Sequence, residues 1–549
     1  MIMKLFRYLI PAIATLVIAS CADFDSVDMQ GGTLLEKQVQ ETYVDMPVRG
    51  QAPFEGLYSS LLQPGFVYGY QSRLQGFRPD DSGLLTILMS NDFESADCLL
   101  PDNDYNWFST CGEYSSRSAD YANPYMRYKA PYDIISLCNT FIASYPEDVT
   151  GDNLYMVAQA HAIKAYCYLL LAPSFCFFTP ELDEPCVPLL TDDVKDPANN
   201  PRATVKEVFD LIIDELTFAV DNLDGFTRTT NAYIDKRAAL ALRARAELFI
   251  RDYQNAYDDA VAAAEGLTPY SIAEVSVPAF YKLSDHNVIW GYDMTTVIAQ
   301  TGPECTHTGW IGSLGGATYA WWTGCYSQIY KPLYDRIPAT DVRKQWWVDE
   351  SLHSTIADVI KYHDPSTNNA DEPVATLTYE DKLPFVPYTN VKFGVNEVGT
   401  MTCDEDFPLV RVEEMLLIQA EAKLGLNDAP AAKTILENFV KTYRDPSYSA
   451  DAHGFELADE IWFQRRVELW GEGFGVPDAR RLNKPIVRMA EGSNWADNFK
   501  FNIAPDDPWL RMRFPTDEIN TNFGIEDNEG GEQPKPGQNS DLFDGVTNI

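Results

Sequence analysis

Seven charged residues in the C-terminal part of the chain could carry out acid–base chemistry, because they combine carboxylates with guanidinium groups. They are Arg411, Glu414, Glu421, Arg465, Glu468, Glu472 and Arg481. A pair of carboxylates is what a glycoside hydrolase requires. These residues fall in stretches with helical periodicity, however, where their spacing favours ion pairs between helices and caps at helix ends. We therefore interpret them as scaffold residues and predict that the chain is not an enzyme.

Aromatic residues that alternate with glycines form a second group of chemical interest. A sugar offers apolar C–H faces and hydroxyl groups, so a sugar site combines flat rings with polar side chains. Adjacent Trp321 and Trp322 point to opposite sides in extended backbone, so we expect at most one of them to meet a ligand. Packing of these rings in the core is the alternative. The candidate ligand residues are Tyr105, Asn106, Trp107, Trp310, Tyr319, Trp321, Trp322 and Tyr326.

One acidic loop resembles a calcium site. Asp102, Asp104, Asn106 and Glu113 occupy the first, third, fifth and twelfth positions of an EF-hand-like loop. Trp107 replaces the glycine that makes the turn, so a polar surface loop is the favoured interpretation. No cysteine or histidine spacing matches a zinc site. We expect no cofactor, with structural calcium as the alternative.

The N-terminus carries an export signal. Lys4 and Arg7 precede an apolar run from Leu9 to Ile18, which is too short to span a bilayer. The run ends in Ile18-Ala19-Ser20-Cys21, which resembles the lipobox of bacterial lipoproteins. This resemblance implies removal of residues 1–20 and acylation of Cys21, which would anchor the protein in outer-membrane lipid. No later segment has the length and apolarity of a membrane span.

The composition excludes one class of partner. The formal net charge is −39, and no basic stripe compensates for it, so nucleic acid is not expected to bind. Nine cysteines remain after Cys21, an odd number for an oxidising compartment. Cys98 with Cys111, and Cys305 with Cys325, are spaced so that each pair could close a local loop.

Several stretches show apolar residues three and four positions apart, as in helices. Thr204 precedes one of them, with Glu207 in the capping-box position three residues on. The stretches 236–265 and 408–443 each have nearly the length of one tetratricopeptide unit. Such units bury their apolar faces only by stacking, so we predict a mainly α scaffold, with generic helix packing as the alternative. The predicted helices cover 153–171, 205–223, 236–250, 253–265, 408–424, 429–443 and 456–470.

Two long stretches, 80–130 and 268–407, lack this periodicity and contain only short β-like runs, such as 287–290. Long irregular loops on a rigid scaffold commonly carry function. We therefore expect a helical repeat scaffold at about 150–267 and 408–482, with a binding lobe formed by the two irregular stretches. The tail beyond Glu526 is rich in Gly, Asn, Asp, Glu and Pro and is expected to be loosely ordered.

Four blocks of the sequence resemble the SusD-like (SusD/RagB) family of glycan-binding outer-membrane lipoproteins. The chain departs from the family pattern at three places. Gln464 stands where the family usually has Glu, Gly475 stands where it usually has Arg, and the segment 513–518 differs from the usual terminal segment. These departures put local salt bridges in doubt, but the blocks follow the family order over nearly the whole mature chain. The blocks are 158–190; 201–223 with 235–260; 409–425 with Arg411, Glu414 and Ala420-Glu421-Ala422; and 464–482 with Arg465, Glu468, Leu469, Glu472, Gly473, Asp478 and Arg481.

The resemblance implies a single SusD-like domain over 21–549, with four tetratricopeptide-like helix pairs and an irregular binding lobe. It also implies a cell-surface lipoprotein that captures glycan and delivers it to a SusC-like TonB-dependent transporter of the outer membrane. A surface scaffold that binds peptide or protein is the alternative. A secreted glycan hydrolase ranks last, because the chain has neither a nucleophile elbow nor a zinc motif.

Overall fold

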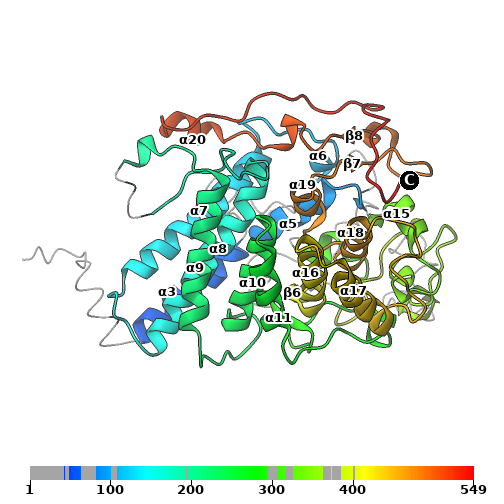
Figure 1. Cartoon of the computed structure of the whole chain (residues 1–549), viewed down its shortest axis with the longest axis horizontal. Coiled ribbons are helices and arrows are strands. Elements are labelled where there is room, and N and C mark those ends of the chain that lie inside the picture. The colour runs from blue at the N-terminus through cyan, green and yellow to red at the C-terminus, as the bar shows by residue number, and fades with distance from the viewer. Residues whose placement is uncertain are drawn as a thin grey trace, which may run out of the picture.

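A computed structural model gives the fold of the chain, which is mainly α as predicted (Figure 1). The structure describes residues 43, 48–63, 82–100, 108–191, 194, 196–294, 306–315, 326–362, 372–373, 385–399 and 402–548. None of the helices in these described residues has the length and apolarity to cross a membrane.

The main helices stand side by side in a row, as Figure 1 shows. Neighbours along the chain pack against each other, and α11 packs against α16, so the two helical stretches form one continuous scaffold. The longer helices are α3 (Val48–Leu61), α5 (Leu84–Phe93), α7 (Ala122–Ala143), α8 (Asp152–Phe175), α9 (Val205–Asn222), α10 (Lys236–Phe249), α11 (Tyr253–Ala264), α16 (Val412–Gly425), α17 (Ala429–Tyr443) and α18 (Leu457–Glu468).

Local sequence signals account for several of these helices. Thr204 caps α9, and its hydroxyl accepts a hydrogen bond from the Glu207 amide while the Glu207 carboxylate accepts one from the Thr204 amide. The predicted capping box is thus confirmed. Asp235 caps α10 and Asp428 caps α17 in the same way, each accepting from a backbone amide three residues on.

Short helices and strands occupy the rest of the described chain. The short helices are α6 (Ser109–Gly112), α13 (His307–Trp310), α15 (Lys331–Arg336), α19 (Gly475–Arg481) and α20 (Thr516–Thr521), with single 3-10 turns at Pro197–Asn199, Glu274–Ser276, Val342–Trp346, Ala357–Val359, Asp497–Phe499 and Pro508–Leu510. The strands, as far as the structure describes them, form four antiparallel pairs: β1 (Cys98–Leu99) with β3 (Gln328–Ile329), β2 (Val288–Tyr292) with β6 (Phe407–Arg411), β4 (Lys361–Tyr362) with β5 (Glu372–Pro373), and β7 (Ile486–Val487) with β8 (Asn502–Ile503).

Three predictions about local structure are wrong. The predicted helix 408–424 begins only at Val412, because 407–411 pairs as β6 with the distant β2. The stretch 80–130 contains α5, whose residues are all buried, so it lacks the apolar and polar faces by which a surface helix is recognised. The tail beyond Glu526 is packed: Val546 is fully buried, and Asp544 lies 3.0 Å from Nη1 of Arg466.

Six of the described cysteines are free thiols in the core: Cys98, Cys111, Cys138, Cys167, Cys176 and Cys186. Cys98 and Cys111 are both buried and unpaired, so the predicted local disulfide between them is wrong. Burial raises the pKa of the Cys111 thiol to about 12, which keeps it protonated and unreactive. Cys305 and Cys325 lie outside the described residues.

Candidate functional site

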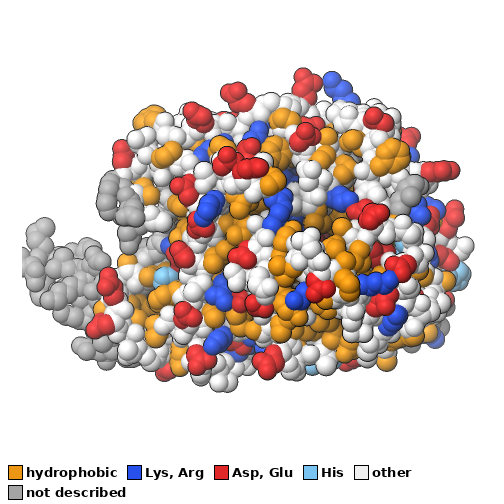
Figure 2. All heavy atoms as spheres, in the orientation of Figure 1, with side chains coloured by type: hydrophobic (Ala, Val, Ile, Leu, Met, Phe, Trp, Pro, Cys, Tyr) orange, Lys and Arg blue, Asp and Glu red, His pale blue; other side chains and the backbone are white. Residues whose placement is uncertain are grey.

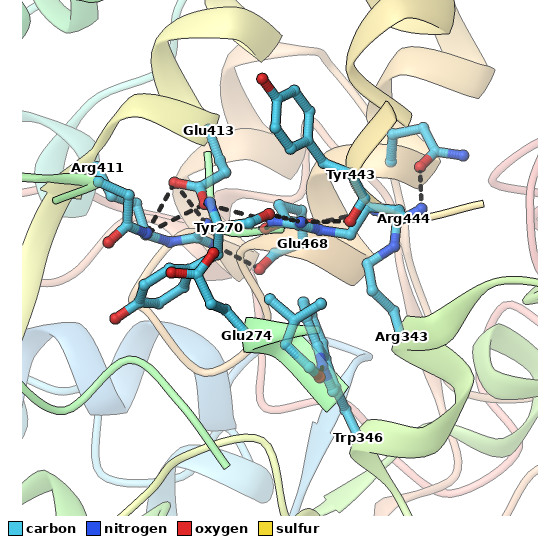
Figure 3. A network of polar contacts seen from close by, with 12 residues as sticks. Tyr270, Glu274, Arg343, Trp346, Arg411, Glu413, Tyr443, Arg444 and Glu468 are labelled. Atoms are coloured by element: carbon cyan, nitrogen blue, oxygen red, sulfur yellow. Dashed lines mark hydrogen bonds and ion pairs between the residues drawn. The ribbon is translucent and has the colours of Figure 1, made fainter. Parts of the chain in front are cut away.

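We call the charged residues of the last two family-like blocks the signature residues. Two signature carboxylates, Glu468 and Glu472, meet in a buried ion-pair network around Glu468, at the end of α18 (Figure 3). Oε1 of Glu468 accepts hydrogen bonds from Arg411 at 2.8 Å and from Arg444 at 2.7 Å. Its Oε2 accepts from Arg444 at 2.8 Å and from Arg343 at 3.3 Å. Burial alone would raise the pKa of Glu468, but the three arginines lower it well below its usual range.

The network extends from Glu468 to further charges, which balance. Glu472 accepts from Arg411 at 2.9 Å and from Lys392 at 2.6 Å. Glu413 lies 3.2 Å from Arg411 and 3.3 Å from Arg444. Four cations face four carboxylates: Arg343, Lys392, Arg411 and Arg444 face Asp341, Glu413, Glu468 and Glu472.

The other signature residues are paired as well. Glu414 holds Arg245 at 2.7 Å, which joins α16 to α10. Arg481 donates to Glu421 at 2.9 Å, which joins α19 to α16. Asp478 accepts from Arg465 at 2.8 Å and from Arg481 at 2.8 Å. The predicted scaffold role is confirmed, because every one of these charges ties one element to another.

The turn after α18 explains Gly473, which follows the family pattern, and Gly475, which departs from it. Gly473 has φ +92°, and a Cβ there would lie 2.8 Å from Cδ2 of Leu88 on α5. The amides of Gly473 and Gly475 donate to Asp92 at 2.7 and 3.1 Å. Burial raises the pKa of Asp92 to about 7, although both amides oppose the shift. The backbone of this turn must therefore approach α5 closely, and Gly475 permits it.

Gln464 shows how one departure is accommodated. Its amide donates to Oε1 of Glu460 at 2.8 Å, and its side-chain oxygen accepts from Arg343. The ion pair that a glutamate would form with Arg343 is replaced by a hydrogen bond from the charged guanidinium to a neutral amide oxygen.

The predicted ligand residues divide into two groups. Trp310 and Tyr326 are in the core, with 1 % and 0 % of their surface exposed. The Trp310 ring packs edge-on against Phe108 at 4.7 Å, and Tyr326 packs against Phe385 at 5.4 Å. For these two residues the prediction is corrected, because neither ring offers a face to a ligand. The other candidates, Tyr105, Asn106, Trp107, Tyr319, Trp321 and Trp322, lie outside the described residues.

Of the calcium candidates, the structure describes Glu113 alone, whose carboxylate accepts from Ser115 at 2.9 Å. Asp102, Asp104 and Asn106 lie outside the described residues, so calcium binding stays a prediction. Elsewhere in the described chain, no group of three or more His, Cys, Asp or Glu residues is placed to hold a metal ion.

An open cavity of about 550 Å³ was missed by sequence reasoning. It lies between α7, the segments 188–190 and 197–200, and α20. We name it the tyrosine pocket. The spacing of Tyr121, Tyr125, Tyr128 and Tyr132 by four, three and four residues could have revealed a helix face. The pocket is lined by Tyr125, Tyr128, Lys129, Tyr132, Asp133, Pro188, Leu190, Pro197, Ala198, Asn200, Pro515, Asp517, Glu518, Thr521 and Asn522.

Two family models match the chain. One, described as "SusD family", covers residues 322–538. The other, described as "Starch-binding associating with outer membrane", covers residues 89–248. The two matched regions together contain most of the helical scaffold and all of the signature charges.

The chain belongs to the SusD family.

Relatives agree with this membership. A SusD-like protein from Formosa agariphila, P38, is 23 % identical over 397 residues, which are 66 % of this chain and 73 % of the relative. A SusD-like carbohydrate binding protein from Bacteroides vulgatus has a crystal structure with TM-score 0.69 and 21 % identity, covering 88 % of this chain and 98 % of its own. A SusD superfamily protein from Bacteroides thetaiotaomicron matches with TM-score 0.66 and 19 % identity over 88 % and 99 % of the two chains. The SusD-like fold therefore extends over the scaffold described above.

Proposed function

We propose that this SusD-family chain is a cell-surface lipoprotein that captures glycan and delivers it to a SusC-like TonB-dependent transporter. The observation that carries the proposal is the family match, whose second model is described as starch-binding and associated with the outer membrane. Acylation of Cys21 would supply the membrane anchor. Structural calcium near Glu113 remains part of the proposal.

The signature carboxylates support binding without catalysis. Glu468 and Glu472 are each held by several cationic groups and are buried, so neither can protonate a glycosidic oxygen. A glycoside hydrolase needs two such groups facing a cleft, and the network around Glu468 is closed to solvent.

A peptide- or protein-binding scaffold is the second candidate, and one observation favours it. A groove of about 460 Å³ lies between α11, α16 and α17, where Val261, Leu416 and Ile435 contribute apolar side chains. Figure 2 shows apolar side chains gathered over α11 and α16 on this face. Such a groove suits an apolar segment better than a sugar.

The test uses the soluble chain that begins after Cys21. Affinity electrophoresis against neutral and anionic polysaccharides, with calorimetry on oligosaccharides of any that bind, measures glycan capture directly. Trp107→Ala and Trp321→Ala variants test the predicted lobe. Retention of the chain by a polysaccharide, with no release of reducing ends from that polysaccharide, supports the proposal. Binding of peptide with no glycan binding would favour the scaffold candidate instead.

The anchor and the partner need separate tests in cells. Cys21→Ser should release the chain from the outer-membrane fraction, and the acylated wild-type chain should co-purify with a TonB-dependent transporter from detergent extracts. A Cys21→Ser chain that stays in that fraction would contradict lipid anchoring.

A further inference from the structure

The tyrosine pocket takes Tyr125, Tyr128 and Lys129 from the end of the predicted stretch 80–130, and its described lining includes no residue of the longer predicted stretch, 268–407. Figure 1 shows α7 and α20 toward one end of the molecule and α15, which belongs to the predicted lobe, at the other. The pocket and the 268–407 part of the predicted lobe are therefore separate places at which a ligand could be held.

One face of α7 carries a stripe of tyrosines that runs into the pocket. Tyr125, Tyr128 and Tyr132 follow each other by about one helical turn, so their side chains lie along one face, and the exposed Tyr121 precedes the helix as its N-cap residue. The stripe passes from the half-buried Tyr125 to the buried Tyr132, which is 9 % exposed. The rings of Tyr128 and Tyr132 pack against each other at 4.5 Å and form an aromatic floor. A row of rings that emerges gradually into solvent suits a chain of sugar rings.

The pocket wall is held in place by internal hydrogen bonds. Asn522 donates to the Asn200 carbonyl at 2.7 Å and to Glu518 at 2.8 Å. Tyr132 donates to the Pro188 carbonyl. These bonds join α7, the 188–200 region and α20, so the pocket is formed before any ligand arrives.

The charge of the pocket is negative. Among the lining residues that the structure describes, Lys129 is the only cation, and its ammonium lies 2.7 Å from Oδ1 of Asp133 on the next turn of α7. This pairing leaves the carboxylates of Asp517 and Glu518 without a balancing cation among the lining residues. They repel anions but can accept hydrogen bonds from sugar hydroxyls.

The phenols complement these acceptors. Burial, with nearby carboxylates, raises the pKa of Tyr125 and Tyr128 above the usual tyrosine value. Both side chains therefore keep their protons at any pH at which binding would be assayed and can donate hydrogen bonds.

We propose that the tyrosine pocket is a second glycan site, which takes uncharged sugars and rejects sulfated or uronic ones. This inference rests on the proposed function, because it assumes that the chain handles glycan. Aromatic faces along α7 meet the apolar sides of the sugar rings, while Asp133, Asp517 and Glu518 accept from their hydroxyls.

The experiment compares pocket variants with matched controls. Tyr125→Ala removes a ring from the stripe. Thr521→Trp fills the pocket from an exposed position on α20 and removes the hydrogen bond from the Thr521 hydroxyl to the Asp517 carbonyl. Phe543→Ala is the control for an exposed ring elsewhere, because Phe543 is 67 % exposed and does not line the pocket. The probes are starch, xylan, β-glucan and galactomannan as neutral polysaccharides, with alginate, polygalacturonate and carrageenan as anionic ones.

The charge preference has its own pair of variants. Asp517→Lys reverses a charge at the pocket, whereas Asp497→Lys makes the same change at a side chain that is 97 % exposed outside it. Retention by the anionic polysaccharides should rise more for Asp517→Lys than for Asp497→Lys.

The expected result is about tenfold weaker retention by a neutral polysaccharide for Tyr125→Ala and Thr521→Trp, with Phe543→Ala unchanged. If Tyr125→Ala lowers the melting temperature, its weaker retention could come from partial unfolding, and the result for Thr521→Trp is then the one that tests the site. Unchanged retention of both pocket variants, where the wild-type chain is retained, overturns the site and leaves the proposed function intact.

Retention of the wild-type chain by anionic polysaccharides alone overturns the charge preference. A wild-type chain that no polysaccharide retains contradicts the proposed function itself, and the inference falls with it.

Discussion

The network around Glu468 and the tyrosine pocket both gather several carboxylates, but they differ in what surrounds them. In the network, four cations balance four carboxylates, and Glu468, Arg444 and Arg343 have no exposed surface. In the pocket, Asp517 and Thr521 are exposed, and the described lining holds a single lysine and three carboxylates. Burial requires each charge to find a partner, whereas exposure leaves charges available to a ligand.

The difference separates scaffold from binding surface within one chain. Figure 2 shows acidic side chains spread over the surface, in keeping with a formal net charge of −39. Among the described carboxylates, those exposed in a hollow beside aromatic rings are therefore the ones available to a ligand.

The largest expected effect comes from breaking the network. Glu468→Gln leaves Arg343, Arg411 and Arg444 without their shared carboxylate, so we expect the free energy of unfolding to fall by about 3–5 kcal/mol. Denaturant unfolding measures this loss. Lys206→Ala is the control, because its pair with Asp210 is 64 % and 52 % exposed and should contribute under about 0.5 kcal/mol. A similarly small loss of unfolding free energy in both variants would mean that the network does not stabilise the scaffold.

The next effect is a pH dependence at the edge of the network. His307 is buried, and its Nε2 lies 2.8 Å from the Gly471 carbonyl. Burial lowers the pKa of His307 from 6.5 to about 4, against the influence of Glu472. The folded protein therefore binds the proton of His307 more weakly than the unfolded chain does. The resulting contribution to the free energy of unfolding is complete above pH 6.5 and is lost as the pH falls toward 4.

That loss should amount to about 3 kcal/mol, from the size of the pKa shift. His307→Gln cannot titrate, so its unfolding free energy should change less than that of the wild-type chain between pH 6.5 and 4. The exposed His353→Gln is the matched control. Equal slopes for His307→Gln and the wild-type chain would show that His307 titrates normally in the folded state.

The pocket should respond in affinity and not in stability. Thr521→Trp adds bulk at an exposed position, so we expect the free energy of unfolding to stay within about 0.5 kcal/mol of the wild-type value. Affinity for a neutral oligosaccharide should fall about tenfold, as measured by calorimetry. A destabilised variant with unchanged affinity would reverse the contrast between the two regions.

The smallest effect concerns the helices that carry both regions. Thr204→Ala removes the capping box of α9, and we expect a loss of about 1 kcal/mol in thermal or denaturant unfolding. Glycan affinity should not change, because α9 lines neither region. A loss above about 3 kcal/mol would mean that Thr204 has a role beyond capping.

Local signals explain what could be predicted from the sequence. Thr204 and Asp235 mark helix starts by their own side chains and apolar spacing marks 429–443, so α9, α10 and α17 were predicted nearly to the residue. The signature charges were assigned to the scaffold from their helical spacing, and their ion pairs agree. Each of these inferences needed only neighbouring residues.

Tertiary contacts explain what could not be predicted. Residues 408–411 form a strand only because β2 lies beside them. The tyrosine stripe of α7 was hidden because the helix is buried over much of its surface and contains Pro131. Trp310 stands among glycines in the sequence yet packs against Phe108, and no local signal separates a core ring from an exposed one.

The most direct test of the account is affinity electrophoresis of the soluble chain in gels that contain neutral polysaccharides, followed by an assay for reducing ends. The account predicts that at least one neutral polysaccharide retains the wild-type chain, that Thr521→Trp is retained less, and that no reducing ends are released. Release of reducing ends, or a chain that migrates freely through every polysaccharide, would contradict it.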